Sequence, residues 1–249
     1  MPNPPIEPIV KDIVEAVQRI FEKHPITPED YRAVVGFLHE VGETGEVPLI
    51  MDVLFEALVV DEYNRGRQST SRNLLGPFYL EGAPYLEDGR LLSENEVGDR
   101  LVMFGTICNL DGEPLAGAEL DVWQADAEGR YSGFNPEPAE MNLRGRLRSG
   151  TDGSYQLHTV RPEGYTIPHD GPTGRLLTAL GRHPWRPAHI HLKASHAGYL
   201  PIITQVYFSN TKHLDSDVAT AVRNDLVRPL KPTDEGYSLE FDVVLEPTA

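Results

Sequence analysis

The N-terminal part of the chain, up to about residue 65, carries apolar residues at helical spacing. Between residues 9 and 21 they recur every three or four positions and form one face of an amphipathic helix. Pro25 ends this helix, and Thr27 followed by Pro28 begins the next, because threonine caps a helix N-terminus and proline fits its first turn. The three predicted helices carry these apolar positions: Ile9, Val10, Ile13, Val14, Val17, Ile20 and Phe21; then Tyr31, Val34, Val35 and Leu38; then Leu49, Ile50, Val53, Leu54 and Ala57.

The pattern changes after the helices. From about Ser69 to Val97 glycine and proline interrupt the chain, and after Gly98 short apolar runs alternate with turn signals, which indicates β-strands. The candidate strands are Leu101–Cys108, Ala118–Gln124, Arg146–Ser149, Ser154–Val160, Ala188–Ala194, Ile202–Phe208 and Tyr237–Leu245. Strands at such short intervals favour an antiparallel sandwich. We therefore predict a mainly β protein, with a helical region over residues 1–68, an irregular connection over 69–98 and a β-sandwich over 99–249.

Composition narrows the possible partners. A chain of 249 residues can bury a substantial core, and its formal net charge of −16 argues against a nucleic-acid partner, which requires a basic footprint. No apolar run approaches the roughly 20 residues of a membrane helix, and the segment Met1–Pro5 does not resemble a secretory signal. The single cysteine, Cys108, excludes an intrachain disulfide and fits a reducing cytoplasm, where we expect the protein.

His189 and His191 are the strongest candidates for chemistry. They lie two residues apart in a predicted strand, so their side chains share one face of the sheet. Two imidazoles side by side can ligate one metal ion, although two polar residues on a solvated face would show the same pattern. Because there is only one cysteine, a multi-thiolate zinc site is excluded. Further ligands would have to be carboxylates or, less commonly, tyrosines.

Tyr131 and Tyr165 lie in loops that leave predicted strands, where a rigid sandwich can present them to a ligand. Neither belongs to a periodic apolar pattern. On pattern alone, each is better explained as a partly buried aromatic ring whose hydroxyl finds a hydrogen-bond partner than as a metal ligand.

The stretch from Asp121 to Phe208 resembles the intradiol catechol dioxygenases. The order and spacing of its motifs agree across the β part, and the helical N-terminus and Leu75–Tyr79 agree with the catechol-type branch. The resemblance therefore covers nearly the whole chain. The motifs are Asp121–Asp126 with Gly129–Ser132, Gly164-Tyr165, Gly171–Leu177, Gly181–His191 and Thr204–Phe208.

The resemblance implies a non-haem Fe(III) held by Tyr131, Tyr165, His189 and His191. Phenolates are anionic donors that favour ferric iron, and imidazoles suit iron as well. It also implies that Tyr165 is displaced by the substrate and helps to accept a proton.

Two further catalytic roles follow from the resemblance. Gln205 would lie near the iron and Arg186 would stabilise charge that develops on the substrate. On a regular strand Arg186 would face away from the histidines, so a bend at Pro187 is required. Without the resemblance, a surface or structural salt bridge would be the preferred role for this arginine.

The same resemblance predicts cleavage of catechols by O2 to cis,cis-muconates. The implied substrate pocket consists of Leu49, Asp52, Val53, Leu74, Gly76, Pro77, Phe78, Val218 and Ala219. Asp52 is unusual on an apolar stripe and resembles the chlorocatechol and hydroxyquinol branches, and the small Ala219 leaves room for a ring substituent. We expect chlorinated or otherwise substituted catechols as substrates, with hydroxyquinol cleavage to maleylacetate as the alternative.

The resemblance also implies a homodimer formed through the N-terminal helices, with a phospholipid at the interface. Two other classes of function remain open at this stage. A non-catalytic β-sandwich binding module would explain the strands but not the Tyr, Tyr, His-x-His set. A zinc hydrolase would use His189, His191 and a carboxylate such as Asp170, and it would be colourless.

Overall fold

The computed structural model describes residues 5–91, 96–136 and 139–248. Residues 1–4, which contain most of the segment compared above with a secretory signal, and residues 92–95 of the predicted connection lie outside the described residues. The chain forms two compact units, Met1–Val47 and Pro48–Ala249. None of the helices in the described ranges is both long and apolar enough to cross a membrane.

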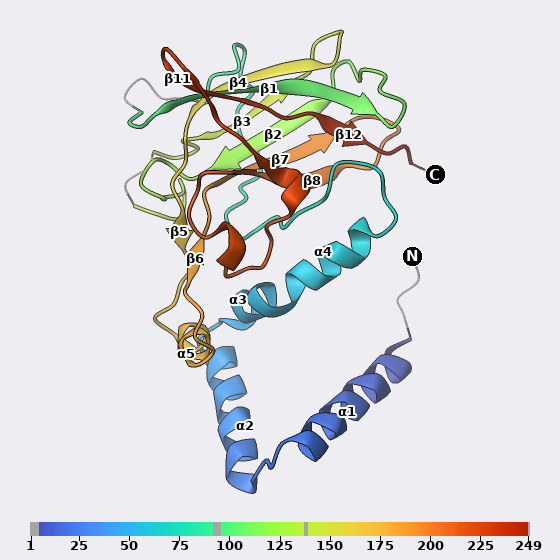
Figure 1. Cartoon of the computed structure of the whole chain (residues 1–249), viewed down its shortest axis with the longest axis vertical. Helices are drawn as coiled ribbons and strands as arrows, with labels where there is room; N and C mark the ends of the chain where they lie inside the picture. The colour runs from blue at the N-terminus through green and yellow to red at the C-terminus, as the bar shows by residue number, and fades with distance from the viewer. Residues whose placement is uncertain (1–4, 92–95, 137–138, 249) are drawn as a thin grey trace. The chain divides into compact units, whose positions relative to one another are not determined.

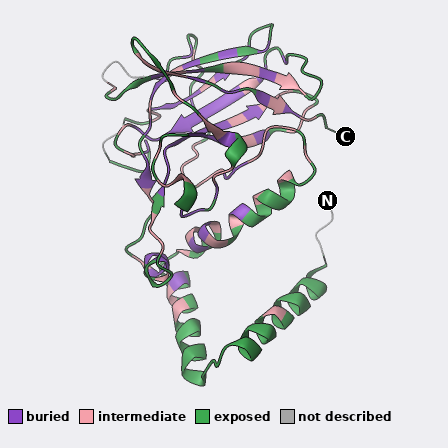
Figure 2. Ribbon diagram, viewed as in Figure 1, coloured by how far each residue is buried: buried purple, intermediate pink, exposed green. Residues whose placement is uncertain are grey.

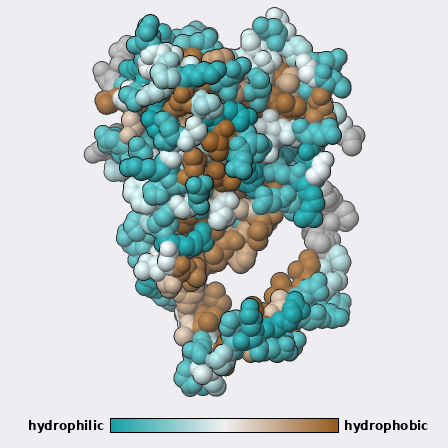
Figure 3. All heavy atoms as spheres, viewed as in Figure 1, coloured by the Kyte–Doolittle hydropathy of each residue, from teal (hydrophilic) through white to brown (hydrophobic). Residues whose placement is uncertain are grey.

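The first unit contains the helices α1 (Ile6–Lys23) and α2 (Pro28–Glu43) (Figure 1). The predicted start of the second helix is confirmed, because Thr27 Oγ1 accepts a hydrogen bond from the Asp30 backbone N–H and the Asp30 carboxylate accepts one from the Thr27 backbone N–H, which is a capping box. The predicted apolar positions 9–21 of α1 are 42–57% exposed. Figures 2 and 3 show these helices as largely exposed, with hydrophobic residues on their surface.

The third predicted helix is broken into three parts in the structure. They are α3 (Val47–Met51), a π-helical turn η1 (Asp52–Glu56) and α4 (Ala57–Asn64). A π-turn inside an α-helix inserts one residue per turn and often occurs at a functional site. It begins here at Asp52, which is half-buried beside the buried Val53.

Two five-stranded sheets and a two-stranded pair form the β part of the described residues. The first sheet contains β1 (Arg100–Asn109), β4 (Ser154–Val160), β10 (Lys231–Thr233), β11 (Gly236–Glu240) and β12 (Val243–Leu245). The second contains β2 (Glu119–Gln124), β3 (Arg144–Arg148), β7 (His189–Ser195), β8 (Ile202–Phe208) and β9 (Val227–Arg228). The pair is β5 (Tyr165–Thr166) with β6 (Trp185–Arg186); the remaining helical segments are α5 (Pro172–Ala179), η2 (Leu214–Ser216) and η3 (Asn224–Leu226).

The prediction of a mainly β protein with a helical N-terminus is confirmed, but the sheets are mixed rather than purely antiparallel. Strand β1 pairs in parallel with β11 and β12, and β8 pairs in parallel with β9. The predicted strand Tyr237–Leu245 is split into β11 and β12. At the break, Thr106 of β1 donates its backbone N–H to the Asp242 carboxylate, which interrupts the regular ladder.

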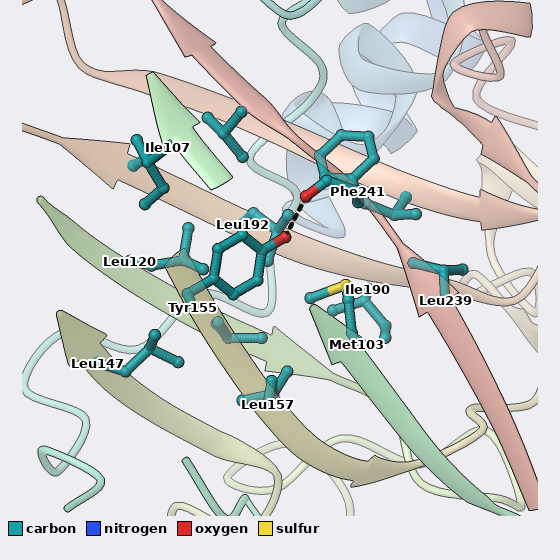
Figure 4. Packing of buried hydrophobic residues seen from close by; sticks show 14 of the residues in the cluster. Met103, Ile107, Leu120, Leu147, Tyr155, Leu157, Ile190, Leu192, Leu239 and Phe241 are labelled. Atoms are coloured by element: carbon teal, nitrogen blue, oxygen red, sulfur yellow. Dashed lines mark hydrogen bonds between the residues drawn. The ribbon is translucent and has the colours of Figure 1, made fainter. Parts of the chain in front are cut away.

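The hydrophobic core lies between the two sheets (Figure 4). Met103 and Leu157 from the first sheet pack in one cluster with Leu120 and Ile190 from the second, and burial of each such side chain contributes about 1.5–3 kcal/mol. Successive residues of a strand point to opposite faces. The residues that alternate with Leu120 and Ile190 in the second sheet therefore face away from this core.

Candidate active site

The outer face of the second sheet carries a group of buried polar and aromatic side chains. His189 and His191 alternate with the core residues of β7, so the predicted common face of the two histidines is observed. Across the ladder His191 is opposite Trp123 on one side and Gln205 on the other, and His189 is opposite Tyr207. All five are at most 2% exposed. The sheet register thus assembles the site from β2, β7 and β8.

Tyr131 reaches the same site from a loop, as predicted, whereas Tyr165 lies in the short strand β5 and not in a loop. Their rings are nearly perpendicular with centroids 5.3 Å apart. The Tyr165 ring lies 5.7 Å from the His189 ring, and the Tyr131 ring lies 6.4 Å from the His191 ring. Both tyrosines are buried, at 1% and 7% exposure. The four predicted ligands, far apart in sequence, are therefore neighbours in space.

Two glycines allow the segments that carry the tyrosines to approach so closely. Gly129 has a positive φ of 80°, and a Cβ there would lie 2.7 Å from the Gly164 carbonyl oxygen. A Cβ on Gly164 would lie 2.7 Å from the Arg186 carbonyl oxygen. Any side chain at either position would push the backbones apart. The loop of Tyr131 is also closed by Asn135, whose side-chain oxygen accepts the Tyr131 backbone N–H at 2.8 Å.

The imidazoles are oriented with their Nε2 atoms toward each other. His189 Nδ1 donates to the Pro187 carbonyl at 2.7 Å. Its Nε2 therefore carries a free lone pair. The two Nε2 atoms are 3.0 Å apart. Burial and then the charge of Arg186 lower the pKa of His189 to about 3, and burial likewise lowers that of His191. Both rings are neutral near pH 7, so a proton or a cation is needed between the two nitrogens.

Burial disfavours the ionised form of both tyrosine hydroxyls. Burial raises the pKa of Tyr131 well above its usual range, and it also raises that of Tyr165, while the charge of Arg186 acts in the opposite direction on both. The Tyr131 hydroxyl has no hydrogen-bond partner among the described residues. A buried hydroxyl without a partner costs free energy unless a ligand satisfies it.

These donors fit a ferric ion. Two cis nitrogen ligands at about 2.0–2.1 Å from a metal are about 3 Å apart, which is the separation observed between the Nε2 atoms of His189 and His191. The unsatisfied hydroxyl of Tyr131 and the buried Tyr165 supply hard oxygen donors, which iron in its ferric state accepts. The donor set is poor for zinc of the structural type, which is usually bound by thiolates and imidazoles.

Arg186 lies beside these residues on a strand of its own. Strand β6 pairs with β5 so that Arg186 is opposite Tyr165, and Pro187-Ala188 separates β6 from β7. Because the chain breaks at Pro187-Ala188, Arg186 does not follow the alternation of β7, which would have turned its side chain away from the histidines. Arg186 is 3% exposed, and its Nη2 donates to Gln205 Oε1 at 3.1 Å and to the Tyr207 hydroxyl at 3.2 Å. Arg186 also forms a buried salt bridge with Asp217, so the structural salt bridge that the sequence allowed is present.

The predicted pocket residues are distributed over three neighbouring apolar clusters. Val53, Val218 and Leu49 pack with Ile167; Leu74 packs with Ala219; and Phe78 packs with the two tyrosines. Gly76 lies against His191, because a Cβ on this glycine would be 3.4 Å from His191 Cε1, whereas Pro77 is exposed. A cavity of about 670 Å³ opens beside Phe78, Tyr131, Tyr165 and Ile167. Of the nine predicted pocket residues, only Phe78 lines this cavity; Ile167, which also lines it, packs in the cluster of Val53.

The structure adds residues to which the sequence argument gave no role. Trp123 stacks on His191 with ring centroids 4.6 Å apart, Tyr207 and Asp217 contact Arg186, and Asn73 donates to the Ala221 carbonyl at 2.8 Å. Tyr207 has the same strand parity as Gln205 in β8, which is a usable signal, whereas Trp123 joins the site through the register of β2 with His191 in β7. Asp217 and Asn73 lie in loops and carry no such signal.

The zinc hydrolase alternative finds no support. In the parts of the chain that the structure describes, no three His, Cys, Asp or Glu side chains come together to hold a metal ion. Asp170 is exposed on the rim of the cavity.

Comparison with known proteins gives consistent matches over almost the whole chain. Residues 74–247 match the family model described as dioxygenase, and residues 3–71 match the model described as catechol dioxygenase N terminus. The chlorocatechol 1,2-dioxygenase of Rhodococcus opacus is 39% identical over 99% of both chains. The crystal structure of 3-chlorocatechol 1,2-dioxygenase from Rhodococcus opacus 1CP superposes with a TM-score of 0.91 at 35% identity, covering 96% of this chain and 97% of that one. The hydroxyquinol 1,2-dioxygenase of Pseudomonas putida DLL-E4 also gives a TM-score of 0.91, at 31% identity, covering 100% of this chain and 94% of that one.

Proposed function

The chain belongs to the intradiol ring-cleavage dioxygenase family, in its catechol and chlorocatechol branch, and from this we propose that it opens the ring of catechols with O2. One catechol and one O2 give one cis,cis-muconic acid, with the ring opened between the two hydroxyl-bearing carbons and both oxygen atoms retained. The observation that supports this most strongly is the convergence of Tyr131, Tyr165, His189 and His191 on one buried face.

We further propose that these four side chains hold a non-haem Fe(III). When bound, the iron lowers the pKa of a coordinated catechol hydroxyl and makes the ring reactive toward O2. Two phenolates partly balance the ferric charge in a site where an uncompensated charge would be costly. The neutral imidazoles of His189 and His191 need no deprotonation near pH 7 to serve as ligands.

The roles of the surrounding residues follow from their contacts. Tyr165 lies at the cavity, and its phenolate, once displaced by the substrate, would accept a catechol proton and become a hydroxyl. Arg186 is a buried cation opposite Tyr165 and stabilises negative charge that develops on the substrate. Gln205 is fixed by donating its amide to the Leu74 carbonyl at 2.7 Å and by accepting from Arg186, so it keeps the arginine aimed at the site.

Substituted catechols are the substrates we favour. The chlorocatechol enzyme of Rhodococcus opacus is 39% identical to this chain, and the hydroxyquinol enzyme of Pseudomonas putida DLL-E4 is 31% identical. Burial raises the pKa of Asp52, which lies half-buried next to Val53 in the predicted ring pocket. This carboxyl group is also the feature that supports the weaker alternative, hydroxyquinol cleavage to maleylacetate, because it can accept a hydrogen bond from a third ring hydroxyl.

We also propose that residues 1–68 form a dimerisation region and that the protein is a homodimer with a phospholipid at the interface. The exposed apolar face of α1 is the observation that supports an interface there. The single Cys108 fits the cytoplasmic location that we propose.

Oxygen uptake with catechol, chlorocatechols, methylcatechols and hydroxyquinol tests the proposed function. The account expects stoichiometric uptake and a ring-opened dicarboxylic acid that carries both atoms of isotopically labelled O2. A product with one labelled atom, or turnover without O2, would refute intradiol cleavage.

A further inference from the structure

Asp217 is a buried carboxylate that receives four hydrogen bonds. Its side chain is 1% exposed. One oxygen accepts Arg186 Nε and the Ala219 backbone N–H, both at 3.2 Å, and the other accepts Arg186 Nη2 at 3.3 Å and the Ala221 backbone N–H at 3.0 Å. Every available direction of the carboxylate is therefore occupied by a donor.

The Asp217 carboxylate compensates the charge of the arginine that is buried beside the four proposed ligands. The other acceptors of Arg186 Nη2, Gln205 and the Tyr207 hydroxyl, are neutral. A guanidinium enclosed at 3% exposure needs a compensating charge, because removing one partner of a buried pair typically costs several kcal/mol. The contact to both Nε and Nη2 also fixes the plane of the guanidinium, which a single contact would not.

The same carboxylate anchors a turn against the strand that carries Arg186. Residues 217–221 curl around Asp217, and the Thr220 backbone N–H donates to the Asp217 carbonyl at 2.9 Å. The Val218 backbone N–H donates to the Trp185 carbonyl of β6 at 3.1 Å. The turn that holds Asp217 is thereby docked on the residue next to Arg186, so the two partners cannot move independently.

We propose that Asp217 is a positioning residue for ring cleavage: it holds the Arg186 guanidinium in the plane and place from which it acts on the substrate. This inference rests on the proposed function, in which Arg186 stabilises developing charge. It assigns Asp217 no contact with the substrate.

The test is Asp217→Asn, examined in the wild-type and in an Arg186→Met background. The amide has the shape of the carboxylate but places an NH2 group against two of the four donors, so the guanidinium must shift. The expected result is a fall in kcat of about 10–100-fold in the wild-type background, a KM changed by less than about threefold, and iron content and visible absorption equal to wild type. In the Arg186→Met background the further loss is less than about twofold, because Asp217 acts through the arginine.

Glu246→Gln is the matched control. Glu246 also accepts from an arginine, Arg67 Nη1, and from a backbone N–H, that of Gln68. Glu246 does not contact Arg186, so kcat of Glu246→Gln should stay at the wild-type value. Thermal unfolding of every variant checks that the fold is retained.

Three results would overturn the inference: an unchanged kcat in Asp217→Asn, an equal loss in both backgrounds, or loss of the visible band, which would make Asp217 a support of the ligands. If Asp217→Asn does not fold, Asp217→Glu keeps the charge and displaces the carboxylate by about one 1.5 Å bond. It should lower kcat at least about fivefold, and a wild-type kcat would overturn the inference. A wild-type protein that consumes no O2 with any catechol refutes the proposed function itself, whereas an active wild type beside a fully active Asp217→Asn refutes only the role of Asp217.

Discussion

The indole of Trp123 lies almost parallel to the imidazole of His191, with ring centroids 4.6 Å apart and an interplanar angle of 11°. The stack supports a ring whose Nδ1 has no hydrogen-bond partner among the described residues. His189, in contrast, is held through its Nδ1 by the Pro187 carbonyl. The two proposed imidazole ligands are thus oriented by different means.

Replacing Trp123 should therefore loosen His191. Trp123→Leu removes the stack. We expect the affinity for iron to fall about 10–100-fold, the range typical when the support of a metal ligand is lost. Trp123→Phe keeps an aromatic face and should retain most of the iron. Iron titration of the metal-free variants measures the difference, and equal affinities for the Leu and Phe variants would show that the stack has no such role.

The metal-free protein should lose stability as the pH falls below about 6.5. The pKa of His189 is about 3 in the folded state against 6.5 for an unperturbed histidine, and that of His191 is also lowered. Below about pH 6.5 the unfolded chain takes up protons that the folded protein does not, so the free energy of unfolding decreases, by up to about 1.4 kcal/mol per pH unit for each histidine.

Urea unfolding of the metal-free protein at about pH 7, 6 and 5 measures this slope. His191→Gln should make it shallower, whereas His24→Gln, at an exposed position of the chain, should not. A free energy of unfolding that stays constant over this range would contradict the buried, neutral histidines.

Asp52 should discriminate among substrates. Its half-buried carboxyl group in the π-turn can accept a hydrogen bond from a ring hydroxyl. Asp52→Leu should therefore lower kcat/KM for hydroxyquinol relative to catechol by about 5–150-fold, which corresponds to about 1–3 kcal/mol. Glu56→Gln, one turn further along the same segment, controls for a general loss of negative charge. An unchanged ratio in Asp52→Leu would remove Asp52 from the specificity determinants.

The exposed apolar face of α1 predicts a dimer in solution. Ile13 is 57% exposed in the middle of this face. Light scattering should give a dimer at micromolar concentration, and Ile13→Glu should dissociate it, whereas Lys11→Glu, at a side chain that is 76% exposed, should not. A wild-type monomer at this concentration would contradict the proposed interface.

Local pattern predicted those parts of the site that a single strand determines. The two-residue spacing of His189 and His191 was sufficient to place both side chains on one face, since strand periodicity is a local property. Arg186 could not be placed this way, because its orientation depends on the pairing of two short strands, β6 with the strand β5 that carries Tyr165. The hydrogen-bonded contact of Arg186 with Asp217 joins residues 31 positions apart in the sequence, and no local pattern predicts it.

The fold shows the same division. Thr27 caps α2 and Pro28 begins it, as predicted from the sequence, whereas the reciprocal bond from Asp30 was seen only in the structure. The parallel pairing of β1 with β11 joins segments more than 130 residues apart, so its direction could not be read from alternation within either strand.

The visible absorption spectrum of the purified, iron-analysed protein tests the central claim most directly. Phenolate coordination to Fe(III) produces a charge-transfer band, so a protein in which Tyr131 and Tyr165 are ligands should be red in proportion to its iron content. Tyr165→Phe should weaken or abolish the band and reduce turnover. A colourless protein that is fully loaded with metal would contradict the ferric site built from Tyr131, Tyr165, His189 and His191.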